Sequence, residues 1–205
     1  MTSTPTTTDL DTELSAVNTI LGSIGQSPVT SISNTNPEIS YIYNLLKESN
    51  IDIQSEGWTF NTEKHVEFVP DADKYIKVPA DVIQMDWHAE ANNRAKDVVK
   101  RNGRMYDKVN HTDEWDEKQN FDVTYLYSFT DIPQVFRRYI IYAAATRAAT
   151  QLVGNPNLAQ LLQQKEVLAR ANCIEYECNQ ADYTFFSQPD DTVYNSYKPY
   201  NALRR

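Results

Sequence analysis

Residues 53–63 read IQSEGWTFNTE, and this stretch decides how the fold is organised. Before it, apolar residues recur every three or four positions, which is typical of a helix that buries one face. After Gly57, apolar and polar residues alternate, beginning with Trp58 and Phe60, as they do in a strand. Glycine often ends helices because a left-handed cap suits a residue without Cβ. The stretch therefore predicts a corner where a helical part of the chain passes into a β-rich part.

Two helices are predicted before this corner. Residues 1–12 are rich in Thr and Ser and hold too little apolar material to order themselves, so we expect a flexible N-terminus. From residue 13 an apolar stripe with helical spacing runs to the stop at Gly25. Asn36 followed by Pro37 is a helix-start signal, because the asparagine caps and the proline needs no N–H there. The second helix then runs to the corner.

Residues 58–130 contain short alternating segments separated by Asp-, Asn-, Gly- and Pro-containing turns. This pattern predicts a small β-rich insertion. Within it, residues 86–102 fit either a hairpin with a long loop or a short helix, and the sequence leaves both open.

Helical periodicity returns at residue 131 and continues to about residue 180. The tripeptide Gly154-Asn155-Pro156 interrupts it with a cap and a new start signal, which predicts an antiparallel pair of helices. We therefore expect an α+β fold that is mainly a helical bundle of about four helices, formed by residues 13–57 and 131–180. The β-rich insertion would lie on its side.

The last segment, residues 181–205, has no apolar periodicity but is unusually aromatic. A disordered tail is normally poor in aromatic residues, so we expect an extended strap that docks on a surface. That surface could belong to its own domain or to a neighbouring subunit or partner, and the enrichment of Tyr and Phe at interfaces favours the second. The aromatic residues are Tyr183, Phe185, Phe186, Tyr194, Tyr197 and Tyr200.

The net charge of −9 argues against a protein that coats DNA or binds anionic membranes. No apolar run approaches the roughly 20 residues that span a bilayer. The charge is also unevenly spread, because residues 1–60 hold seven acids and one base, whereas residues 131–205 hold seven acids and eight bases. The two ends of the chain therefore present different electrostatic surfaces.

A search for catalytic and ligand-binding motifs finds no nucleotide-binding glycine loop and no metalloprotease signature. The three histidines lack metal-ligand spacing, and Cys173 and Cys178 are too far apart on one helix for a disulfide, so we expect reduced thiols. We expect no enzymatic activity, no cofactor and no metal.

Two clusters offer alternatives to a purely structural role. Four acids, Asp113, Glu114, Asp116 and Glu117, surround Trp115 and could serve a polysaccharide hydrolase, although a solvated acidic loop is the simpler interpretation. Residues 94–108 hold six bases and two acids, which suits either phosphate contact, as in a DNA-binding accessory protein, or a salt-bridged subunit contact.

Several stretches together resemble one family. They are ELSAVNTILGSIGQSPV at 13–29, the GWTFN corner within 53–63, DIPQVFRRYIIYAAATRAATQLVGNP at 131–156 and the Glu-Tyr-Glu of residues 175–177. This combination resembles tail tubular protein A of short-tailed, autographivirus-type phages. The resemblance implies a non-enzymatic virion protein of the phage tail, an adaptor or gatekeeper whose copies form a dodecameric ring.

The resemblance also implies the partners. The ring would join the portal protein to the tail nozzle, tail tubular protein B, with tail fibres attached near that junction. It would help retain packaged DNA and let it pass through the lumen without sequence-specific binding. The aromatic residues of 181–205 are then candidate portal or subunit contacts. Gly57, Trp58 and Phe60 are candidates for a structural joint, with both rings turned toward the helices.

Overall fold

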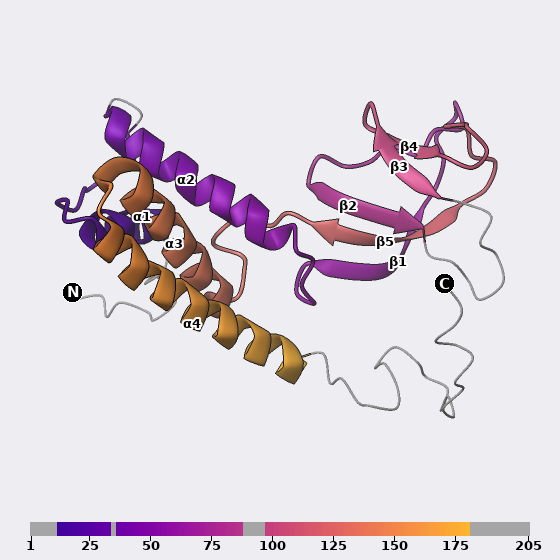
Figure 1. Ribbon diagram of the computed structural model, residues 1–205. Helices are drawn as coiled ribbons and strands as arrows, with labels where there is room; N and C mark the ends of the chain where they lie inside the picture. The colour runs from indigo at the N-terminus through magenta and orange to yellow at the C-terminus, as the bar shows by residue number, and fades with distance from the viewer. Residues whose placement is uncertain (1–11, 34–35, 88–96, 181–205) are drawn as a thin grey trace, which may run out of the picture.

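The computed structural model of the protein describes residues 12–33, 36–87 and 97–180. Helices gather at one end and strands at the other, joined by two chain segments that run side by side (Figure 1). The first segment leads from α2 into β1, and the second from β5 into α3. No helix in these ranges has both the length and the apolar character needed to cross a bilayer.

The helical body contains α1 (Glu13–Ser23), α2 (Pro37–Gln54), α3 (Gln134–Ala148) and α4 (Pro156–Gln180). The other three helices all pack against α3. Its small residues Ala143, Ala144 and Ala145 are buried, which allows close approach of neighbouring helices. As the Asn-Pro signal predicts, the Asn36 side chain caps α2 by accepting a hydrogen bond from the Glu38 amide.

The turn between α3 and α4 combines three local features. Residues Ala149–Val153 widen into one π-helical turn (η2), and Gly154 follows in the left-handed conformation with φ of 66°. The Asn155 side chain then accepts hydrogen bonds from the amides of Asn157 and Leu158 at 3.0 and 3.3 Å. These caps begin α4, which returns along α3.

The strands form two antiparallel sheets. The larger has the order β1-β5-β2, with β1 (Thr62–Phe68), β2 (Val82–Trp87) and β5 (Gln119–Tyr125). The smaller pairs β3 (Val98–Arg101) with β4 (Arg104–Asp107). A second hydrophobic core, separate from that of the helices, fills this body, and its buried members are Ile76, Val78, Val82, Met85, Val98, Met105, Trp115, Phe121 and Val123.

The expectation of a mainly helical bundle with a small β-rich insertion is wrong. The structure is a mixed α+β fold in which five strands build a body with its own core. The strands are short, but residues between them such as Trp115 complete that core, and a period-two pattern does not assign such a loop residue to a core. At the corner, α2 already ends at Gln54, and β1 begins only at Thr62.

Candidate functional site

The corner between the two bodies is built around one aromatic ring of α3. Gly57 has φ of 73°, which turns the chain sharply after α2. Trp58 is 7% exposed and its indole Nε1 donates a hydrogen bond to the Ile53 carbonyl at 2.7 Å. The rings of Trp58 and Phe60 lie 4.9 and 4.6 Å from that of Phe136, between centroids. The structure therefore brings both predicted joint aromatics onto the helical core.

Two fully buried amide side chains, Gln54 and Asn61, connect the segments that pass between the bodies. Asn61 Nδ2 donates to the carbonyls of Gln54 and Tyr125 at 2.9 and 3.0 Å, and its Oδ1 accepts from the Trp58 amide at 2.8 Å. Gln54 in turn forms two hydrogen bonds with the backbone of Tyr127. The sequence patterns did not predict a structural role for either amide, although Asn61 is the last residue of the GWTFN motif.

Side chains of helix α4 also form hydrogen bonds with this corner. The guanidinium of Arg170 donates to both carboxylate oxygens of Glu56 at 2.8 Å and to the Tyr139 hydroxyl at 2.8 Å. These partners raise the pKa of Arg170 further above its usual value. Glu177 accepts from the amide and the hydroxyl of Thr59 at 2.8 and 2.9 Å. The corner is thus tied to α4 by charged hydrogen bonds, which are stronger than neutral ones.

Most of α4 is exposed, and its exposed residues include several large apolar side chains. Of its 25 residues, only Leu162, Ala169 and Cys173 are buried. Four large aliphatic side chains point away from the core, with exposed fractions of 59% for Leu161, 64% for Val167, 64% for Leu168 and 48% for Ile174. Exposed large apolar side chains gathered on one element are typical of an interaction surface. Helical periodicity found α4 but did not show that so little of it is buried.

A pocket of about 330 Å³ lies between α1, α2 and the segment 126–129. Its lining is largely apolar and includes Leu46, Ile51 and Phe129. At its polar margin the Tyr43 hydroxyl donates to Glu13 Oε2 at 2.7 Å, and this hydrogen bond raises the pKa of Tyr43. Lys47 Nζ lies 4.1 Å from the centroid of the Tyr43 ring.

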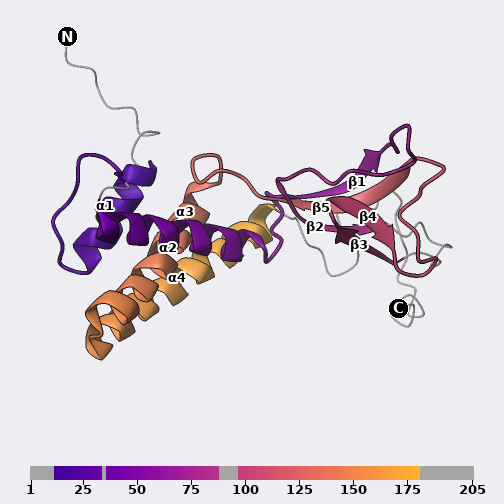
Figure 2. The ribbon, with the colours of Figure 1, turned by 90° about the horizontal axis from the view of Figure 1, so that it is seen from above.

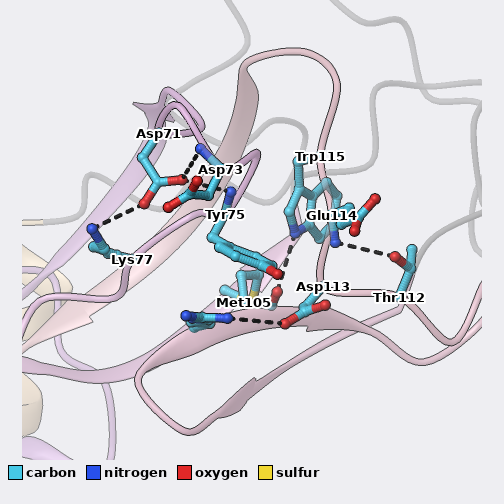
Figure 3. A network of polar contacts seen from close by, with 10 residues as sticks. Asp71, Asp73, Tyr75, Lys77, Met105, Thr112, Asp113, Glu114 and Trp115 are labelled. Atoms are coloured by element: carbon cyan, nitrogen blue, oxygen red, sulfur yellow. Dashed lines mark hydrogen bonds and ion pairs between the residues drawn. The ribbon is translucent and has the colours of Figure 1, made fainter.

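The acidic cluster around Trp115 does not have the geometry of a glycosidase. The Trp115 indole donates to the Met105 carbonyl at 3.1 Å (Figure 3). The residue is only 4% exposed, so the face of the ring is not open to a sugar. Asp116 pairs with Lys74 at 2.6 Å, and this contact lowers the pKa of Asp116. Asp113 lies 3.6 Å from Arg104. A glycosidase acid needs a raised pKa, so Asp116 does not suit that role.

The basic segment is described from residue 97 onward, and several of its cations already have partners within the chain. Lys108 pairs with Asp97 at 2.6 Å. The guanidiniums of Arg101 and Arg104 lie over the rings of Tyr106 and Tyr75, 4.2 and 3.7 Å from the centroids. This arrangement leaves less of the segment's charge available for phosphate.

Three further sequence predictions have different outcomes. The six aromatic residues of 181–205 lie outside the described residues. The expectation of reduced thiols is confirmed, because Cys173 and Cys178 are both free, and burial raises the pKa of Cys173 to about 12. Within the described ranges, no group of three or more His, Cys, Asp or Glu side chains could hold a metal ion.

Known proteins match this chain over most of its length. A family model described as tail tubular protein matches residues 14–183. Tail tubular protein A of Klebsiella phage KP34 is 28% identical over 155 residues, which cover 75% of this chain and 81% of that relative. The family match extends from α1 through all five strands to the end of α4. The chain therefore belongs to the tail tubular protein family and is a structural component of the phage virion tail.

Proposed function

We propose that this chain is the tail adaptor, whose copies form a dodecameric ring between the portal and the tail nozzle. The observation that carries the proposal is the exposed surface of α4, where four large aliphatic side chains are exposed on a helix with three buried residues. Such a face stabilises a protein only when a partner covers it. The described chain is also elongated, with helices at one end and strands at the other (Figure 1). This shape suits a subunit held between two different partners.

The charge of the chain supports a role around passing DNA. At a net charge of −9, a ring of copies repels the phosphate backbone and lets DNA move through its lumen without binding. Retention of packaged DNA and its release at infection are part of this proposal. The role has no catalytic step, in keeping with the buried indole of Trp115 and the cation-paired Asp116.

Size-exclusion chromatography with purified portal protein tests the adaptor role. We expect this chain and the portal to elute together, ahead of either alone. Separate elution at micromolar concentration of both proteins would contradict the proposal. Binding to duplex DNA with a steep dependence on salt would instead favour a DNA-binding accessory role through residues 94–108.

A further inference from the structure

The exposed apolar residues of α4 form two separate lines along the helix. Residues seven positions apart lie on nearly the same side of a helix, so Leu161, Leu168 and Glu175 form one line, here called the leucine stripe. Val167 and Ile174 form the other. At about 100° per residue, the two lines lie on opposite flanks of the buried line of Leu162, Ala169 and Cys173. Neither line faces α3.

The apolar pocket faces the other side of the helical body. It is formed by α1, α2 and the segment 126–129, whereas α4 packs along α3. Seen from above, α4 lies at one side of the helices and α1 at the other (Figure 2). A head-to-tail ring needs two different complementary surfaces on each subunit, and these two surfaces are placed as such a ring requires.

We propose that the leucine stripe of one protomer seats in the apolar pocket of the next copy. This inference rests on the proposed ring and names its subunit interface. Leu161 and Leu168 would lie against Ile51, which is 45% exposed, with the buried side chains of Leu46 and Phe129 behind it. The exposed aliphatic surface of Ile51 and of the two leucines would then leave water.

Charge complementarity favours the leucine stripe of a second copy as the occupant of the pocket. Glu175 continues the leucine stripe, and both Lys47 and Glu13 line the pocket. Glu13 accepts a hydrogen bond from the Tyr43 hydroxyl of its own subunit, so Lys47 is the charged group that a Glu175 of the next copy would meet. An acid and a base at the edge of an apolar contact fix its register and speed association. The line of Val167 and Ile174 has no acid at the corresponding position, because the residue seven positions after Ile174 is Ala181.

Paired aspartate substitutions test the interface in the full chain. The test variant is Leu161→Asp with Leu168→Asp, and the matched control is Val167→Asp with Ile174→Asp, whose side chains are similarly exposed. We expect circular dichroism to show both folded, and mass photometry with purified portal to show the ring lost only for the test variant. A test variant that still forms the complete ring, including one that fails only to join the nozzle, would overturn the inference.

Disulfide cross-linking identifies the partner surface directly. In a Cys178→Ser background, Leu168→Cys and Ile51→Cys proteins are oxidised separately and as a mixture, at high concentration with and without portal. We expect a covalent dimer only in the mixture, and none when Val167→Cys replaces Leu168→Cys. A dimer from Leu168→Cys alone, or none in the mixture, would overturn the inference. If the wild type fails to join the portal, the adaptor role fails, but the cross-link without portal still decides on this interface.

Discussion

Gln54 and Tyr127, 73 positions apart in the chain, are joined by a reciprocal pair of hydrogen bonds. Gln54 Nε2 donates to the Tyr127 carbonyl at 2.9 Å, and the Tyr127 amide donates to Gln54 Oε1 at 2.9 Å. One residue ends α2, and the other lies between β5 and α3. The pair therefore fastens together the two segments that connect the helical and β bodies.

Replacing this buried amide should cost stability. Gln54→Leu keeps a similar shape but leaves the Tyr127 N–H and carbonyl without the side-chain partner, so we expect a loss of about 1–3 kcal/mol in the free energy of unfolding. Urea denaturation followed by circular dichroism measures it. Gln26→Leu is the control, because Gln26 makes an exposed side-chain hydrogen bond to Glu38 and should change stability by less than about 0.5 kcal/mol. Equal losses for the two variants would contradict the role of Gln54.

Trp58 should be a major contributor to the stability of the corner. Trp58→Ala removes a buried indole that packs edge-on against Phe136, so we expect a loss of about 3–5 kcal/mol. Trp58→Phe should lose less, because a ring remains against Phe136. Chemical denaturation measures both variants. A loss below about 1 kcal/mol for Trp58→Ala would show that the corner does not depend on this ring.

Asp107 should make stability depend on pH. The residue is 2% exposed, and burial acts to raise the pKa of its carboxyl. Hydrogen bonds from the Asn110 side chain and from the amides of Val109 and Asn110 outweigh burial and lower this pKa. A folded pKa below the unfolded one gives stability that is complete above the unfolded value of about 3.9 and is lost as pH falls through the folded value.

The corresponding test compares the wild type with Asp107→Asn from pH 7 down to about pH 3. We expect the variant to be less stable at neutral pH by about 1–3 kcal/mol, because its amide nitrogen faces N–H donors. We also expect the difference between the two proteins to shrink below about pH 4. If the difference in unfolding free energy between the two proteins stays constant over this pH range, the charge of the Asp107 carboxylate does not contribute to stability.

The aromatic segment should matter for assembly rather than for folding. Deleting residues 183–205 should leave the unfolding free energy of the monomer unchanged and abolish co-elution with the portal. A full-length variant with all six aromatics of this segment changed to Ser should behave in the same way. Loss of stability with intact portal binding would instead show that the segment packs on its own domain. Unimpaired assembly of both variants would refute its role as a contact.

Local signals in the sequence predicted much of the helical part. Asn36 and Asn155 begin helices because each places a side-chain acceptor beside free amides, and this chemistry lies within three residues of each cap. Gly57 and Gly154 adopt positive φ, as glycines after helices often do. Such features can be read from a sequence because both interacting groups are neighbours in the chain.

The rest depends on contacts between distant residues. Nothing in the local sequence distinguishes Gln54 and Asn61 from amide side chains on a protein surface. They are buried because the segment between β5 and α3 packs against them. The separate core of the β body was missed because loop residues such as Trp115 complete it. The exposed side of α4 was missed because helical periodicity does not tell which apolar residues a neighbouring helix covers.

The most direct test of the adaptor role is the mass of purified portal rings with and without an excess of this chain, measured by mass photometry. A dodecameric adaptor ring predicts that the portal mass rises in one step by twelve times the 23.5 kDa of a single chain. A portal mass that stays unchanged at saturating concentrations of the chain would contradict the proposed role.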